Sequence, residues 1–200
     1  NAAASDSLAI TASSFTGNTA NTTAGGSTAN PGGAIQFIGG SLDVRSTTFS
    51  GNSSGIASGG ALYYQATGAT SGETLSIQGS TFANNRATAS GVNGGAAVAV
   101  SDPHGGASMS ISSSSFTGNA PVGGASFPGA GLWLDGGSLS VTGSTFASNT
   151  NPANAGSAIA VTGGALSARY NRISGNSAPA VKQSGGTADL PRNWWGCVGG

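Results

Sequence analysis

Apolar residues occur along the chain in short alternating runs that return at nearly constant intervals. The most regular run is a triplet with an apolar residue at its first and third positions. Such triplets begin at Leu8, Leu42, Leu75, Met109, Leu139 and Leu166, and a further one begins at Ala188. Alternation with a period of two is typical of a β-strand with one buried face. The pattern therefore predicts β-strands and gives no helical signal.

Each of the first five triplets is followed by a phenylalanine and, three residues later, by an asparagine. The phenylalanines are Phe15, Phe49, Phe82, Phe116 and Phe146. The asparagines are Asn18, Asn52, Asn85, Asn119, Asn149 and Asn176, the last of which follows Ile173. Successive asparagines are separated by 34, 33, 34, 30 and 27 residues. A period of this length indicates a solenoid, in which each repeat packs only on its neighbours.

A third strand signal in each repeat begins with small residues and then alternates. It covers residues 32–37, 59–64, 94–100, 129–134 and 156–161. One such strand buries about two apolar side chains, so a repeat forms a core only when equivalent strands stack about 4.8 Å apart. We therefore predict ladders of phenylalanine and of asparagine. The residue before each asparagine, usually glycine, is expected to adopt a positive φ.

The sequence thus predicts one all-β domain, a single-stranded parallel β-helix of about six coils of 27–34 residues. Residues 1–7 are a lead-in, residues 8–190 form the coils, and residues 191–200 close the domain. Composition agrees with so narrow a solenoid, because Gly, Ala, Ser and Thr make up 120 of the 200 residues and Leu, Ile, Val and Phe only 33.

Charge and cysteine content exclude several functions. Six basic and six acidic residues give no net charge, which argues against binding of nucleic acid or of anionic membranes. No apolar run approaches the ~20 residues needed to span a bilayer, which argues against insertion into a membrane. One cysteine, Cys197, allows no internal disulfide and no cysteine-based zinc site. Few charges and many hydroxyl groups favour an extracellular or cell-surface location.

The repeated Phe-x-x-Asn and Gly-Gly-Ala-(Ile/Leu) motifs resemble those of the chlamydial polymorphic outer-membrane proteins and of other bacterial parallel β-helix surface proteins. The resemblance covers roughly residues 8 to 196, and the ending Asn193-Trp-Trp-Gly-Cys197 is similar to the segment that closes the β-helix in such proteins. It implies a right-handed β-helix, display outside the cell and, often, adhesion.

The acidic residues do not form the clusters that polysaccharide lyases or hydrolases need. They are Asp6, Asp43, Glu73, Asp102, Asp135 and Asp189. Only Asp102 and Asp135 fall near equivalent positions of adjacent coils, where the alternatives are a weak cation site, a carboxylate dyad or two solvated loop residues. His104 has no nucleophilic partner in the sequence. We therefore predict no catalytic residue, no metal and no cofactor.

Several surface features suggest binding. Trp133 and Tyr63 are expected to point outward and are candidates for contact with a glycan. Insertions at residues 19–31, 65–73 and 120–128 are expected to leave from one edge of the coil. The last coils are basic and form either a glycan or phosphate patch or a polar cap. An outward row of hydroxyl groups precedes the phenylalanines, at Ser14, Thr48, Thr81, Ser115 and Thr145.

The ends of a solenoid expose apolar cross-sections and strand edges. Trp194, Trp195 and Cys197 are expected to form a cap or junction at one end, whereas residues 1–7 are too small and polar to cover the first coil. We therefore predict a non-enzymatic structural or adhesive protein. Its partner is another copy stacked head to tail into a filament or the rest of a longer surface protein. A protein that binds or degrades polysaccharide is the alternative.

Overall fold

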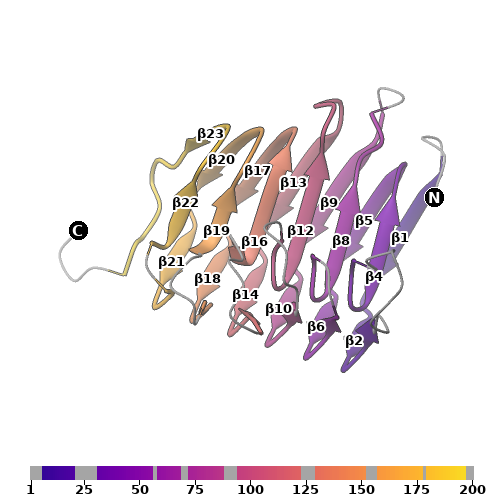
Figure 1. The fold of residues 1–200 in the computed structure, drawn as a ribbon, viewed down its shortest axis with the longest axis horizontal. Helices are drawn as coiled ribbons and strands as arrows, with labels where there is room; N and C mark the ends of the chain where they lie inside the picture. Colours follow the sequence, from indigo (N-terminus) through magenta and orange to yellow (C-terminus); the bar gives the residue numbers. More distant parts are fainter. Residues whose placement is uncertain are drawn as a thin grey trace.

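The chain folds as an all-β solenoid. The computed structural model describes residues 6–20, 31–55, 58–68, 72–87, 94–122, 129–151, 157–177 and 179–196. These residues form strands and no helix, and the strands build four parallel sheets, here called sheets A to D. Figure 1 shows the strands stacked side by side along the long axis, with the two termini at opposite ends. The predicted parallel β-helix is confirmed.

Sheets A and B contain the strands that the apolar triplets and the phenylalanines predict. Sheet A consists of β1 (Ser7–Thr11), β5 (Ser41–Arg45), β9 (Thr74–Gln78), β13 (Ser108–Ser112), β17 (Ser138–Thr142), β20 (Ala165–Arg169) and β23 (Thr187–Asp189). Sheet B consists of β2 (Ser14–Thr16), β6 (Thr48–Ser50), β10 (Thr81–Ala83), β14 (Ser115–Thr117), β18 (Thr145–Ala147) and β21 (Arg172–Ser174). Strand β23 begins a seventh coil, with Ala188 paired to Leu166.

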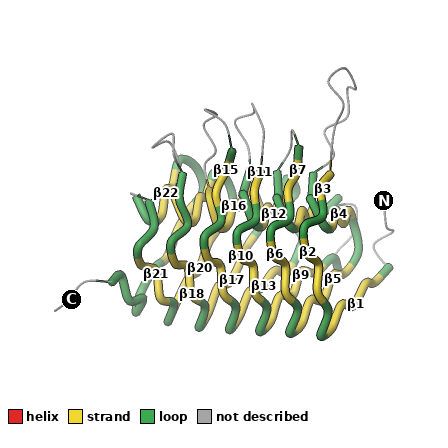
Figure 2. Tube along the Cα trace, turned by 90° about the horizontal axis from the view of Figure 1, so that it is seen from below, coloured by secondary structure: helices red, strands yellow, loops and turns green. Residues whose placement is uncertain are grey.

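Sheet D contains the third predicted strand of each repeat. Sheet C consists of short strands that the sequence pattern does not reveal. Sheet C consists of β3 (Thr19–Ala20), β7 (Ser53–Ser54), β11 (Arg86–Ala87) and β15 (Ala120–Pro121). Sheet D consists of β4 (Ile35–Ile38), β8 (Leu62–Gln65), β12 (Val98–Asp102), β16 (Gly129–Gly136), β19 (Ser157–Val161) and β22 (Val181–Gln183). Figure 2 shows how each coil winds from one sheet to the next.

Equivalent apolar side chains stack inside the coils. Leu42, Leu75, Met109, Leu139 and Leu166 follow one another across sheet A in strict register. The rings from Phe15 to Phe146 stack in sheet B with centroids 5.0, 4.7, 4.9 and 4.6 Å apart and planes within 6° of parallel. Each coil therefore buries a complete cross-section of the core between its neighbours.

The Gly-Gly-Ala motif meets a steric requirement where the chain enters sheet D. At Gly60, an added Cβ atom would lie 2.0 Å from the carbonyl oxygen of Ala96 and 2.2 Å from that of Arg86. The preceding Gly59 has φ of +71°, a conformation that L side chains rarely adopt. The two glycines allow adjacent coils to approach closely at this corner.

Candidate binding face

A ladder of buried asparagines fixes the turn after each strand of sheet B. The side-chain oxygen of Asn119 accepts hydrogen bonds from the backbone N and the Nδ2 of Asn85, at 2.9 and 3.0 Å. Its Nδ2 donates to the carbonyl of Phe82 and to Oδ1 of Asn149, both at 2.9 Å. The ladder runs from Asn18 to Asn176. The residues before these asparagines have φ of 55–65°.

A second polar ladder, absent from the sequence analysis, fixes the corner between sheets A and B. Its members each accept a hydrogen bond from the backbone N–H of the preceding coil's member, as Ser144 Oγ does from Ser114 at 3.1 Å. After Ser13, the accepting residues are Thr47, Ser80, Ser114, Ser144, Asn171 and Asn193. The two ladders hold neighbouring coils in one register on either side of sheet B.

The outer face of sheet A presents aligned columns of small polar side chains. The three strands β9, β13 and β17 carry only hydroxyl and amide side chains there. They are Thr74, Ser76, Gln78, Ser108, Ser110, Ser112, Ser138, Ser140 and Thr142. Ion pairs flank this neutral region, Asp43 with Arg45 and Arg169 with Asp189, each at 2.7 Å. Asp43 and Arg45 alternate with the buried Leu42 and Val44, so both side chains lie on the outer face.

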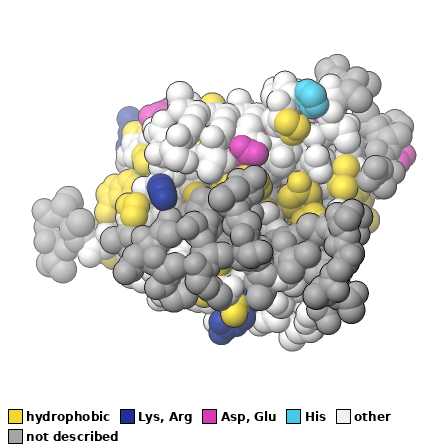
Figure 3. Space-filling model, in the orientation of Figure 1, with side chains coloured by type: hydrophobic (Ala, Val, Ile, Leu, Met, Phe, Trp, Pro, Cys, Tyr) yellow, Lys and Arg dark blue, Asp and Glu magenta, His cyan; other side chains and the backbone are white. Residues whose placement is uncertain are grey.

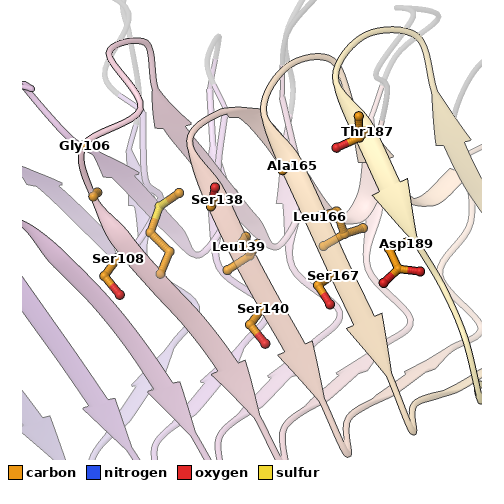
Figure 4. A pocket seen from close by; sticks show the side chains of 12 residues that line it. Gly106, Ser108, Ser138, Leu139, Ser140, Ala165, Leu166, Ser167, Thr187 and Asp189 are labelled. Atoms are coloured by element: carbon orange, nitrogen blue, oxygen red, sulfur yellow. The ribbon is translucent and has the colours of Figure 1, made fainter.

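A shallow groove of about 590 Å³ crosses the last four strands of this face. One wall is a column that contains Ser108, Ser138 and Thr187, and the other contains Ser140, Ser167 and Asp189. Figure 4 shows the latter side chains in a row across β17, β20 and β23. The groove thus offers hydroxyl groups, each a donor and an acceptor, except at Ala165 in the first column and at Asp189 in the second.

The acidic residues in the described parts of the chain are engaged with other groups rather than gathered at a site. Register places Asp135 opposite Ser101, whereas Asp102 lies opposite Gly136. The two carboxylates therefore lie on opposite sides of the sheet, and the expected approach of Asp102 to Asp135 is wrong. Asp102 is fully buried and accepts hydrogen bonds from the backbone N–H groups of Gly105 and Ala107. Asp135 accepts one from Thr162.

Glu73 is a second buried carboxylate, 1% exposed, and it secures the turn before β9. It accepts hydrogen bonds from the backbone N–H groups of Thr67 and Gly68 at 3.0 Å and from the hydroxyl of Thr67 at 2.5 Å. Burial opposes ionisation of Glu73, but these hydrogen bonds outweigh it and lower the pKa. Burial and then the charges of Glu73 and Asp102 raise the pKa of Tyr64 well above its ordinary value.

Replacement of Glu73 by glutamine is expected to lower the free energy of unfolding at pH 7 by about 2 kcal/mol, because hydrogen bonds to a charged group are lost. Because the pKa of Glu73 is lowered in the folded protein, the ionised carboxylate adds to the free energy of unfolding. This stabilisation is complete above about pH 4.3, the ordinary glutamate pKa, and is lost as pH falls through the folded-state pKa. Urea unfolding of the unaltered protein and of Glu73→Gln at several pH values should therefore show that the difference between their free energies of unfolding becomes smaller as the pH is lowered. Asp189→Asn, at an exposed ion pair, is the control, and a difference constant with pH would contradict the assignment.

Trp133 and Tyr63 lie outside the main core, as alternation predicts, but Trp133 is not exposed. It packs with Ala99, Ala160 and Tyr63 on the outer side of sheet D, with 3% of its surface accessible. Its indole N–H donates to the hydroxyl of Thr162 at 2.8 Å. The expectation of an open ring at Trp133 is therefore wrong, and its contact with a glycan has no structural support.

Of two other expected surface features, the outward row of hydroxyl groups is present, whereas the insertions leave the coils at more than one edge. The hydroxyls before the phenylalanines do face outward, and those of Ser115 and Thr117 lie 3.1 Å apart. The insertions do not share one edge, because residues 19–31 and 120–128 follow sheet C whereas residues 65–73 follow sheet D. Within these insertions, residues 21–30, 69–71 and 123–128 lie outside the described residues.

The closing segment continues the stack. Asn193 accepts hydrogen bonds from Asn171, and Trp194 forms a β-bridge with Arg172. The Trp194 ring lies outside, under the Arg172 guanidinium at 4.7 Å, so it does not cover the core as a cap would. Trp195, which follows on the inward side, is 41% exposed. Cys197 lies outside the described residues.

Figure 3 shows charged side chains as isolated spots on one face of the molecule. The described residues contain no group of three or more histidine, cysteine or acidic side chains able to hold a metal. Within the same residues, no helix is long and apolar enough to cross a membrane. Comparison with protein-family models, with curated proteins and with solved structures gives no match.

Proposed function

We propose that the protein is a non-enzymatic, extracellular β-helix with a structural and adhesive role, and that it binds polysaccharide along the outer face of sheet A. The observation that carries this proposal is the groove across β13, β17, β20 and β23, whose outward columns consist mostly of serine and threonine. An extracellular setting is supported by the low charge and high hydroxyl content of the sequence.

The geometry of this face suits an extended neutral polysaccharide. A chain that lies across the strands meets hydroxyl groups at successive coils, such as Ser140 and Ser167, and each hydroxyl can pair with a sugar hydroxyl as donor or acceptor. Because two hydrogen-bonded ladders hold the coils, the face loses little conformational freedom on binding. The neutral outer face of β9, β13 and β17 favours uncharged sugars there.

The engagement of the acidic residues supports adhesion over polysaccharide degradation. Glu73 and Asp102 hold turns, Asp135 accepts from Thr162, and Asp43 and Asp189 pair with arginines. Among the described residues, none of these five carboxylates has a second carboxylate as a hydrogen-bonding or ion-pair partner. The partner expected from the sequence, a second copy stacked end to end or the rest of a longer surface protein, remains part of the proposal.

Ser140→Asp is expected to weaken binding to neutral polysaccharides by about tenfold, because a carboxylate in the groove loses hydration when a sugar covers it. Co-sedimentation with insoluble polysaccharides and affinity electrophoresis in soluble ones measure the binding. Thr117→Asp introduces the same group on the exposed face of sheet B and is the matched control.

Two results would refute the proposal: no binding by the unaltered protein across the panel, or equal loss in both variants. The same incubations report degradation, because an enzyme would release new reducing or unsaturated ends. Such release, abolished by Asp135→Ala, would replace adhesion by catalysis.

A further inference from the structure

The corner between sheets A and B changes character in the last two coils. The turn residue at this corner has φ between 48° and 59° in all seven coils. In chain order it is Ala12, Ser46, Gly79, Ser113, Gly143, Tyr170 and Arg192. A positive φ is a strained conformation for bulky side chains. Five coils thus carry a small residue at this position, and two carry a tyrosine and an arginine despite the strain.

The outward column two residues further on changes in the same two coils. It runs in register along the first strand position of sheet B and ends at an isolated bridge. Its members are Ser14, Thr48, Thr81, Ser115, Thr145, Arg172 and Trp194. Each of the last two coils therefore has one arginine and one aromatic residue at the corner. The first of these coils has the aromatic residue at the turn and the arginine in the column, and the second has them the other way round.

These four side chains form two pairs between the last two coils and are all exposed. Arg192 donates to the hydroxyl of Tyr170 at 2.5 Å, and its guanidinium lies 5.7 Å from the Tyr170 ring centroid. Arg172 lies 4.7 Å from the ring centroid of Trp194. Tyr170 is 59% and Trp194 46% exposed. We call this set the corner patch.

The backbone under the corner patch is fixed by the polar ladder. Asn171 points inward between Tyr170 and Arg172, is 2% exposed and donates from its backbone N to Oδ1 of Asn193 at 2.8 Å. The backbone N of Trp194 donates in turn to the carbonyl of Asn171 at 2.8 Å. The four side chains are therefore presented from a rigid surface.

The charges of the corner patch are not neutralised within the described part of the chain. Arg45 and Arg169 each form an ion pair with an aspartate, whereas neither Arg172 nor Arg192 has a carboxylate within ion-pair distance there. Strained residues persist where the surrounding structure holds them and cluster at sites of function. Exposed aromatic residues and arginines are also the side chains enriched at binding hot spots.

We propose that the corner patch binds the acidic sugars of an anionic polysaccharide. A guanidinium group pairs with a sugar carboxylate through two parallel hydrogen bonds, and an aromatic ring packs against the apolar face of a pyranose. Two free arginines are too few for stable binding to nucleic acid or to an anionic membrane, which rely on many charges. This site lies at the corner of sheets A and B and is independent of the groove on sheet A.

The test compares binding of polygalacturonate and of neutral dextran by isothermal titration calorimetry. The double variant Arg172→Thr/Arg192→Ser carries residues already present in these columns, so the fold should survive, as circular dichroism will verify. Its affinity for polygalacturonate should fall at least about a hundredfold, since each of the two charge-assisted pairs contributes at least about tenfold. Arg45→Gln, with its charge already paired, should bind nearly as well as the unaltered protein.

A second variant separates specific recognition from general attraction of charges. Trp194→Thr leaves the net charge unchanged and should still weaken polygalacturonate binding several-fold. The proposal is overturned if polygalacturonate does not bind, if Arg45→Gln loses as much affinity as the double variant, or if vesicles of anionic lipid bind in its place. Loss of binding to neutral polysaccharides alone would affect only the proposal for sheet A.

Discussion

Asn119→Ala should lower the free energy of unfolding by about 4 kcal/mol or more, the largest effect that we expect of any single substitution. The change removes the side-chain acceptor of the buried backbone N of Asn85, one of the two acceptors of Asn85 Nδ2 and a donor to the carbonyl of Phe82. Each buried polar group left unpaired costs about 1–3 kcal/mol. Urea unfolding followed by circular dichroism measures the loss.

Asn18→Ala is the matched control, because it is the same substitution at the exposed end of the same ladder. Asn18 donates to Asn52, and no hydrogen bond to its own side-chain oxygen is present in the described residues. Its replacement should change the midpoint of unfolding only slightly. If both variants lost the same stability, the ladder would not contribute through its buried rungs.

Phe116→Ala should cost about 3–5 kcal/mol, the usual range for removal of a buried ring. The Phe116 side chain is inaccessible, and its ring stacks on Phe82 at 4.9 Å and on Phe146 at 4.6 Å. Each aromatic contact contributes about 0.5–1.5 kcal/mol beyond the buried area. The cavity that remains between two rings should bind benzene, which would raise the melting temperature of this variant alone.

Phe116→Leu provides the comparison, since a more conservative apolar replacement should cost less than about 2 kcal/mol. Ile173 already occupies the equivalent position after Phe146, so the column accommodates an aliphatic side chain. Equal losses in the alanine and leucine variants, or no response to benzene, would show that stacking of the rings contributes little.

The fold could be predicted because its strands leave a period in the sequence. Leu75 and Ile77, or Leu139 and Val141, alternate with polar residues and recur with each coil. The strands of sheet C could not be found in this way, because a strand of two residues, such as Ser53–Ser54, is too short to show alternation.

The polar ladder at the corner of sheets A and B escaped prediction for a different reason. Serine and threonine are so common in this chain that Ser80 and Ser114 do not stand out, although each is nearly inaccessible. The repeated hydroxyl two residues before each phenylalanine was the available signal. The burial of Trp133 depends on packing between coils, and a single strand's alternation predicts only the direction of the side chain.

The candidate site was only partly foreseeable. The basic character of residues 169–192 was evident from the sequence, but the crossed arrangement of arginines and aromatic rings depends on the register between two coils. Register also explains why Asp102 and Asp135 do not approach each other. A shift of one residue along a strand moves a side chain to the opposite face.

The asparagine ladder also makes the length of this protein independent of its cross-section. Each internal rung binds the rung before it and the rung after it through the same set of atoms, as Asn85 and Asn119 do. Insertion or deletion of one whole coil would therefore recreate the hydrogen bonds of this ladder at the new boundary. The length of such a molecule changes in steps of about 4.8 Å, one for each coil. Duplication of the gene segment that encodes a coil can lengthen it while the asparagine ladder continues unchanged.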